Sequence, residues 1–87
     1  MYKIGFLHAA WEDYEYWEKQ DKKTLNKIKV LIKKLQRHPF EGTGKPELLT
    51  GVLADSWSRR IDGYNRLVYQ VVDDVVFIKQ LRTHYGE

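Results

Sequence analysis

The chain has 87 residues with a hydrophobic fraction of 43%, which predicts a single folded domain over residues 1–87 rather than a disordered protein. It contains no cysteine, which excludes disulfide bonds and thiolate metal sites, and no charged-then-apolar leader or long apolar run predicts export or membrane insertion, so a cytoplasmic protein is expected. The net charge of +3 gives the chain a mild attraction to polyanions, and it suits RNA or an acidic protein partner equally.

The first half of the chain predicts a short strand and two helices. Apolar and polar residues alternate over residues 2–6, as in a strand, and residues 9–19 then carry apolar side chains at helical spacing. Asp21 breaks this pattern and is a suitable N-cap for a second helix. Pro39 is expected to end that helix, because the residue before a proline is pushed out of the helical region. Two helices so close together predict an αα-hairpin.

The second half of the chain predicts a small sheet. Glycines and a proline make residues 41–46 a loop, whereas residues 48–53 are ambiguous and include at most a short strand. Three clear strands are expected at residues 56–61, 66–72 and 75–81. The predicted fold class is therefore α+β, with the αα-hairpin packed on one face of a small, mostly antiparallel, twisted sheet.

Three residues at the margins of this sheet suit RNA cleavage without a metal: Glu47, Arg66 and His84. A carboxylate accepts the proton of a ribose 2′-OH, a guanidinium holds the phosphate, and an imidazole protonates the leaving 5′-oxygen. Free glutamate and histidine have pKa values of about 4.3 and 6.5, which suit a base and an acid near neutrality. Taken singly, however, each residue is more often a solvated carboxylate, a surface cation or part of a frayed chain end.

Several motifs in the same order make the chain recognisable. Residues 57–61 (WSRRI), 66–69 (RLVY) and 84–85 (HY) strongly resemble the YoeB/Txe branch of the RelE toxin superfamily. Residues 12–17 and 39–47 are similar to the same family, so the resemblance runs along essentially the whole chain. It implies the RelE-like fold of small microbial ribonucleases. It also implies the toxin of a type II toxin–antitoxin system, an mRNA endonuclease (mRNA interferase) that acts in the ribosomal A site and inhibits translation.

The resemblance also implies roles for individual residues. Glu47 would be the general base, His84 the general acid, Arg66 the phosphate clamp, and Tyr85 an aid to substrate positioning. The products would be a 2′,3′-cyclic phosphate and a free 5′-OH, formed without any metal or cofactor. The implied partners are mRNA, the ribosome, a cognate antitoxin protein and a second copy of the chain in a homodimer.

This chain departs from the family pattern at Thr50, where many relatives carry a lysine that is thought to assist at the phosphate. Threonine can donate a hydrogen bond but brings no charge. Lys45, Arg59 and Arg60 are the candidate substrate-binding residues that would supply the positive charge instead. The chain also continues for two residues, 86 and 87, past the usual His-Tyr ending.

Two other classes of function remain open on the same fold. One is a non-catalytic RNA-binding or ribosome-binding module, and the other is a module whose main role is to bind the antitoxin. Intact Glu47, Arg66 and His84 argue against both, since a degraded enzyme would tend to have lost one of them. A zinc site is not predicted, because His8 and His38 lack neighbouring residues at metal-ligand spacing.

Overall fold

The computed structural model describes residues 1–42, 44 and 46–82, and two helices and five strands occur in this part of the chain. In chain order they are β1 (Lys3–Phe6), α1 (His8–Gln20), α2 (Lys22–Leu35), β2 (Glu47–Leu48), β3 (Trp57–Arg60), β4 (Arg66–Val72) and β5 (Val75–Gln80). A single 3₁₀ turn, Gly51–Leu53, lies between β2 and β3 in the described chain. The ambiguous segment 48–53 therefore contains the end of a two-residue strand and this turn.

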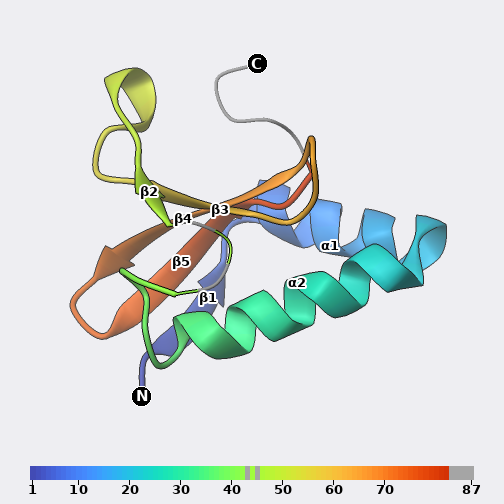
Figure 1. Cartoon of the computed structure of the whole chain (residues 1–87), viewed down its shortest axis with the longest axis horizontal. Coiled ribbons are helices and arrows are strands. Elements are labelled where there is room, and N and C mark those ends of the chain that lie inside the picture. Colours follow the sequence, from blue (N-terminus) through green and yellow to red (C-terminus); the bar gives the residue numbers. More distant parts are fainter. Residues whose placement is uncertain (43, 45, 83–87) are drawn as a thin grey trace.

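The strands form one sheet in the order β1-β5-β4-β3-β2. Strand β1 runs parallel to β5, and the other three neighbouring pairs are antiparallel. Both helices pack on the same face of the sheet, and the hairpin that contains β2 projects from its far edge (Figure 1). The predicted α+β fold with a mostly antiparallel sheet is confirmed.

A single residue both ends α1 and starts α2. The backbone N–H of Asp21 donates to the carbonyl of Trp17, which closes the last turn of α1. Its side chain accepts hydrogen bonds from the backbone N–H groups of Lys23 and Thr24, at 3.1 and 3.2 Å, which caps α2. The predicted αα-hairpin is confirmed, with no loop between its helices beyond this residue.

The second helix ends earlier than the proline predicts. Its last residue is Leu35, four positions before Pro39. The backbone N–H groups of Arg37 and His38 both donate to the carbonyl of Lys34, a tight turn that replaces the next helical turn. Pro39 therefore follows the helix rather than terminating it.

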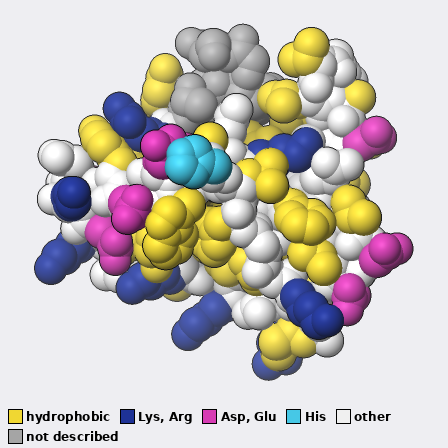
Figure 2. Space-filling view, turned by 180° about the vertical axis from the view of Figure 1, so that it is seen from behind, with side chains coloured by type: hydrophobic (Ala, Val, Ile, Leu, Met, Phe, Trp, Pro, Cys, Tyr) yellow, Lys and Arg dark blue, Asp and Glu magenta, His cyan; other side chains and the backbone are white. Residues whose placement is uncertain are grey.

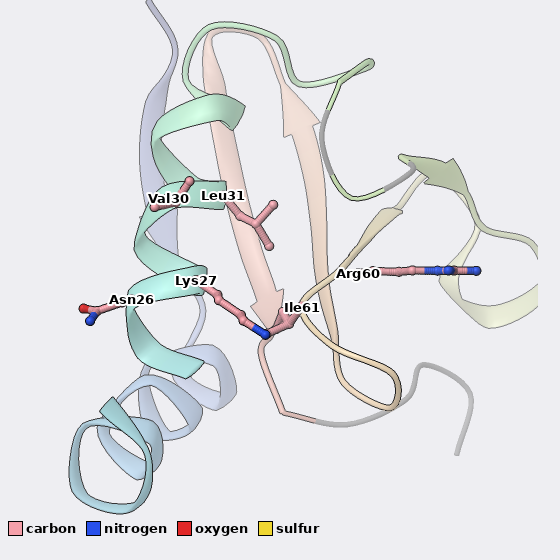
Figure 3. Close-up of a pocket in the computed structure, with 6 residues that line it drawn as sticks. All are labelled: Asn26, Lys27, Val30, Leu31, Arg60 and Ile61. Carbon is pink, nitrogen blue, oxygen red and sulfur yellow. The ribbon is translucent and has the colours of Figure 1, made fainter. Parts of the chain in front are cut away.

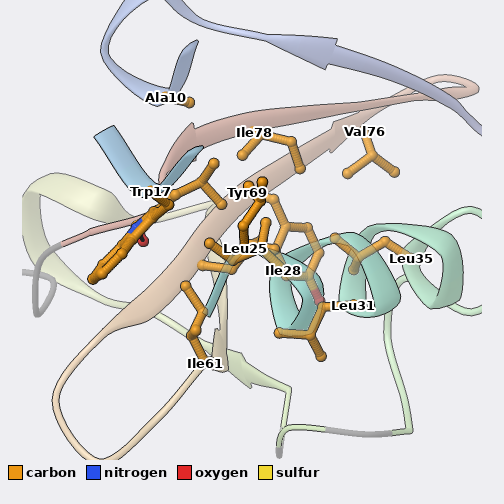
Figure 4. Packing of buried hydrophobic residues seen from close by; sticks show 12 residues of the cluster. Ala10, Trp17, Leu25, Ile28, Leu31, Leu35, Ile61, Tyr69, Val76 and Ile78 are labelled. Atoms are coloured by element: carbon orange, nitrogen blue, oxygen red, sulfur yellow. Dashed lines mark hydrogen bonds between the residues drawn. The ribbon is translucent and has the colours of Figure 1, made fainter. Parts of the chain in front are cut away.

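The core lies between the helices and the sheet (Figure 4). The apolar stripe of α2 packs with Trp17 of α1 against the central strands β4 and β5. The largest fully buried apolar contributors from these elements are Ile28, Leu35, Leu67, Tyr69 and Ile78. This packing fixes which side of each strand faces the helices.

Candidate active site

The strand register places Glu47 and Arg66 on one face of the sheet. Glu47 pairs with Ser58, and Arg66 pairs with Arg60. Paired residues point to the same side of a sheet, as do residues two apart on one strand. Trp57, which alternates with Ser58, packs against the helix-side core, so these four residues point away from the helices. We call this side of the sheet, which α1 and α2 leave uncovered, the helix-free face.

Glu47 and Arg66 are separated by two strand spacings across the sheet and two residues along it. With ordinary strand geometry their Cα atoms are therefore about 12 Å apart. This separation of the two backbones leaves room for a phosphodiester between the side chains. The arrangement provides a carboxylate and a guanidinium that can contact one bound phosphate and its ribose.

Glu47 stands on an exposed edge strand that a short hairpin joins to β3. Glu47 itself is exposed, whereas Leu49, two residues later, is only 6% exposed and anchors the hairpin. The backbone N–H of Leu49 donates to the carbonyl of Ser56 at 2.8 Å, which extends the pairing of β2 with β3. The hairpin thus holds a solvent-accessible carboxylate on a fixed backbone.

A hydrogen-bonded turn before β4 holds Arg66. One terminal nitrogen of Arg66 donates to the carbonyls of Asp62 and Asn65, at 3.0 and 3.2 Å. The Asp62 carboxylate in turn accepts from the backbone N–H groups of Tyr64 and Asn65. Burial acts to raise the pKa of Asp62, but these hydrogen bonds outweigh it and the pKa is lowered. The carbonyls of this turn therefore orient the Arg66 guanidinium.

Arg60 lies beside Arg66 on the helix-free face, as the prediction of a substrate-binding residue requires. Its side chain is exposed and points away from α2, in contrast to Leu31 and Ile61, which lie between helix and sheet (Figure 3). Its backbone N–H donates to the carbonyl of Gly44 at 2.8 Å, which joins the loop before β2 to β3. Gly44 has a φ of 87°, a conformation that favours glycine.

The prediction that Arg59 contacts substrate is not supported. Its side chain is fully buried on the helix side of β3, where its guanidinium donates to the carbonyls of His38 and Glu41. Its Nε also donates to the hydroxyl of Tyr69 at 3.3 Å, and that hydroxyl donates to the carbonyl of Pro39. Strand alternation explains the difference, because neighbouring residues of a strand face opposite sides. Arg59 therefore holds the loop after α2 in place.

Burial also changes the acidity of Tyr69. Removal of its hydroxyl from water raises its pKa, and the adjacent Arg59 charge only partly opposes this. The hydroxyl therefore stays protonated and remains a hydrogen-bond donor to the loop. The buried Arg59–Tyr69 pair is a structural feature of the helix side, not part of the helix-free face.

Lys45, His84 and Tyr85 lie outside the described residues, whereas contacts of Leu81 and Arg82, just before the last two, are described. The backbone N–H of Leu81 donates to the Asp13 carboxylate at 3.0 Å, and its carbonyl accepts from the Trp17 indole at 2.9 Å. The guanidinium of Arg82 then lies 3.7 Å from the centre of the Tyr16 ring. Helix α1 thus holds the chain just before the HY motif.

Sequence reasoning missed this anchor. Asp13, Tyr16 and Trp17 belong to the 12–17 segment that resembles the family, but no role was predicted for them. Their spacing of three and four residues is the available signal, since it places them on one side of a helix. What this side contacts depends on the tertiary fold, which the spacing does not specify.

Figure 2 shows the face of the molecule opposite to the view of Figure 1. In the view from behind, hydrophobic side chains occupy much of the centre of the surface, and charged groups of both signs lie mostly around them (Figure 2). Within the described ranges, no three His, Asp or Glu side chains gather as metal ligands would. Neither of the helices described there has the length and apolar character needed to cross a membrane.

Comparison with known proteins gives the family. A family model described as "YoeB-like toxin of bacterial type II toxin-antitoxin system" matches residues 6–85. The toxin YoeB of Streptomyces coelicolor is 48% identical over 83 residues, which cover 95% of this chain and 99% of that toxin. The heterotetrameric YoeB–YefM toxin–antitoxin complex of Staphylococcus aureus has a similar chain, with 42% identity, a TM-score of 0.87, and coverage of 98% and 99% of the two chains.

A YoeB dimer from Staphylococcus aureus is similar to the same degree, with 42% identity, a TM-score of 0.88, and coverage of 97% of this chain and 98% of that one. These matches extend over nearly the full length of each partner and confirm both the resemblance and the fold. The chain therefore belongs to the YoeB-like family of toxins from bacterial type II toxin–antitoxin systems.

Proposed function

We propose that this toxin is a cytoplasmic endoribonuclease that cleaves mRNA in the ribosomal A site and so inhibits translation. The observation that carries the proposal is the shared face of Glu47 and Arg66, with Arg60 beside them. A base and a phosphate clamp on the same side of a sheet suit attack on an RNA backbone. Lys45 joins Arg60 as a proposed substrate contact.

The proposed reaction is a transphosphorylation that needs only side chains. Glu47 accepts the proton of the ribose 2′-OH, the 2′-oxygen forms a bond to phosphorus, and the bond from phosphorus to the 5′-oxygen breaks. His84 donates a proton to the leaving 5′-oxygen, while Arg66 stabilises the charge on the phosphate oxygens. Tyr85 helps to position the substrate. The products are a 2′,3′-cyclic phosphate and a 5′-OH.

Dependence on the ribosome fits the weak charge of the chain. Electrostatic contacts with phosphates supply most of the sequence-independent affinity for nucleic acid, and they weaken as salt increases. A net charge of +3 with acidic residues interspersed gives little grip on free RNA. We therefore propose that the ribosome delivers the message to the helix-free face, and that naked RNA is cleaved slowly.

The proposed protein partners follow the relatives. The Staphylococcus aureus toxin forms a complex with YefM and also a dimer, and we propose a cognate antitoxin and a homodimer for this chain. An acidic antitoxin segment that folds on binding would suit the lysines of α2 and the arginines of the helix-free face. By covering that face or displacing the HY end, it would keep the toxin inactive.

Translation in a cell-free extract, followed by mapping of mRNA 5′ ends, tests the proposal. The wild-type toxin is expected to produce new 5′ ends within translated codons, and Glu47→Ala is expected to produce almost none. The same message without ribosomes should be cut much more slowly. Equal cutting of naked and translated message would reject ribosome dependence. No cutting of either would favour the non-catalytic RNA-binding, ribosome-binding or antitoxin-binding module.

A further inference from the structure

Strand β5 contains an irregularity beside the proposed active site. Tyr69 of β4 pairs with Ile78, but the next residue of β4, Val68, pairs with Gln80. Lys79 is therefore an extra residue on β5, as in a β-bulge. Bulges change the direction of side chains and occur often next to active sites. The consequence here is that Gln80 lies on the same side of the sheet as Lys79, instead of alternating with it.

Strand alternation directs Lys79 onto the helix-free face, because its neighbour Ile78 is fully buried in the helix-side core. Its ammonium donates to the hydroxyl of Ser56 at 2.8 Å. Ser56 lies two residues before Ser58 and, by alternation, shares its side of the sheet. Gln80 also belongs to this side, because it pairs with Val68, which pairs with Ser58. Lys79 thus reaches across β4 toward the start of β3.

This position places the Lys79 ammonium on one side of Glu47, the proposed base, and Arg60 and Arg66 on the other side. Along β3, Arg60 and Ser56 lie on opposite sides of Ser58, each about 7 Å from it. Ser58 is the residue that Glu47 pairs with. Cations therefore flank the Glu47 position at both ends of one strip of the sheet, in which Ser56 and Ser58 themselves are buried. Such a strip suits a chain of successive phosphates better than a single anion.

Lys79 also provides positive charge beside a hairpin segment that has none of its own. The hairpin segment 47–56 contains no lysine or arginine. In the part of the chain that the structure describes, no carboxylate lies within ion-pair distance of Lys79, and its bond to Ser56 is to a neutral hydroxyl. An ammonium has three donors, so that bond leaves others for an anion. If the side chain at position 79 only had to hydrogen-bond Ser56, a neutral donor would be sufficient.

We propose that Lys79 is a substrate-binding residue that contacts an RNA phosphate next to the one cleaved. The inference rests on the proposed function and adds a phosphate contact on the far side of Glu47 from Arg60 and Arg66. A lysine is sufficient for this role, since contact with a neighbouring phosphate needs a positioned charge and not a planar, two-pronged donor. Its effect is on binding of RNA rather than on the proton transfers.

Binding of a single-stranded RNA that carries 2′-O-methyl groups throughout tests this contact, because such RNA lacks the attacking hydroxyl and cannot be cleaved. Fluorescence anisotropy at increasing salt gives the affinity and its salt dependence for wild type, Lys79→Met and Lys79→Arg. Lys79→Met should weaken binding and reduce the slope of log K against log salt by about 0.7, the value for one phosphate contact on a single strand. Lys79→Arg should restore the slope.

Two further variants separate charge from structure. Lys29→Met removes an exposed lysine from α2, on the other side of the sheet, and should leave the salt slope unchanged. Ser56→Ala removes the tether but keeps the cation, and should retain the slope even if thermal unfolding shows lower stability. A wild-type slope in Lys79→Met, or a slope reduced as much in Ser56→Ala, would overturn the assignment.

The nuclease proposal can fail separately. If wild type binds the methylated RNA with a slope that depends on Lys79 but does not cut translated message, the phosphate contact stands and the nuclease function falls. If wild type cuts message while Lys79→Met keeps the wild-type slope, the function stands and the contact falls. Absence of RNA binding by the wild type at low salt would overturn the contact as well.

Discussion

The two faces of the sheet use the same residue type differently, as neighbouring Arg59 and Arg60 show. On the helix side, the Arg59 guanidinium is fully buried and donates to backbone carbonyls of the loop after α2. On the helix-free face, Arg60 is exposed and points away from the helices. One charge therefore stabilises the fold, whereas the other is available to a ligand.

The contrast extends beyond these arginines. The helix side satisfies its polar groups within the protein, as the Tyr69 hydroxyl and the Trp17 indole do with backbone carbonyls. The helix-free face instead presents Glu47 on the two-residue edge strand β2 and Arg66 at the start of β4. Substitutions on the helix side should therefore change the free energy of unfolding, and those on the helix-free face should change RNA cleavage.

The largest expected effect is loss of the proposed base. Glu47→Ala should lower the rate of mRNA cleavage by about 10²–10⁴-fold, the usual contribution of a general acid or base. Because Glu47 is exposed on an edge strand, the free energy of unfolding should change by only about 0.5 kcal/mol or less. Rates of cleavage in the translation extract and urea unfolding curves measure both. Glu18→Ala, an exposed carboxylate on α1, is the matched control and should retain activity.

Loss of the phosphate clamp should be nearly as severe. Arg66→Ala removes charge stabilisation of the transition state and should lower cleavage by about 10²–10³-fold. Arg66→Lys should restore only part of this, because lysine lacks the planar fork that also donates to the turn carbonyls. Single-turnover rates at saturating ribosome–mRNA complex provide the measurement. Full activity in Arg66→Lys would show that charge alone suffices.

Local patterns were sufficient to predict most of the fold. Strand β4 has the predicted bounds, β3 and β5 are shorter by one or two residues, and Asp21 caps α2 as its position suggested. These features depend on alternation, helical spacing and capping, which act within a few residues. The exit from α2 was less predictable, because the turn at Lys34 competes with the effect of Pro39.

The site was harder to predict because it depends on which side of the sheet the helices cover. Two adjacent arginines look alike in sequence, and only packing against α2 decides that Arg59 is buried. The side of Gln80 depends on a bulge between β4 and β5, a register that the local pattern of β5 does not encode. The anchor of Leu81 on Asp13 and Trp17 joins residues more than 60 positions apart.

Exchange of the two arginines for methionine tests the comparison directly. Arg59→Met should lower the free energy of unfolding by about 2–4 kcal/mol, because the carbonyls of His38 and Glu41 lose buried, charge-assisted donors. Arg60→Met, the matched change on the other face, should shift it by about 0.5 kcal/mol or less. Urea unfolding at neutral pH measures both. Equal losses in the two variants would contradict the division between faces.

A smaller effect is expected from Tyr69→Phe. The change keeps the buried ring and removes only the hydroxyl that donates to Pro39 and accepts from Arg59. Stability should fall by about 1–2 kcal/mol, the cost of leaving one buried acceptor without its donor. Cleavage should change little, because the hydroxyl lies on the helix side. A free energy of unfolding equal to that of wild type would mean that water replaces the hydroxyl in the loop.

The smallest expected effect concerns the turn that holds Arg66, and it depends on pH. The pKa of Asp62 is lowered from its ordinary value of 3.8, because hydrogen bonds from Asn65 and Tyr64 outweigh its burial. A lowered folded-state pKa means that the ionised carboxylate stabilises the fold at pH values above the pKa of the unfolded chain. This stabilisation is lost as pH falls through the folded-state pKa.

Asp62→Ala should therefore destabilise the protein by about 1 kcal/mol at pH 7. The difference from wild type should persist down to about pH 5 and shrink below pH 4. Urea unfolding of both proteins across this range measures it, with Glu15→Ala, an exposed carboxylate on α1, as the control. A difference that stays constant to pH 3 would mean that the side chain acts by shape and not by charge.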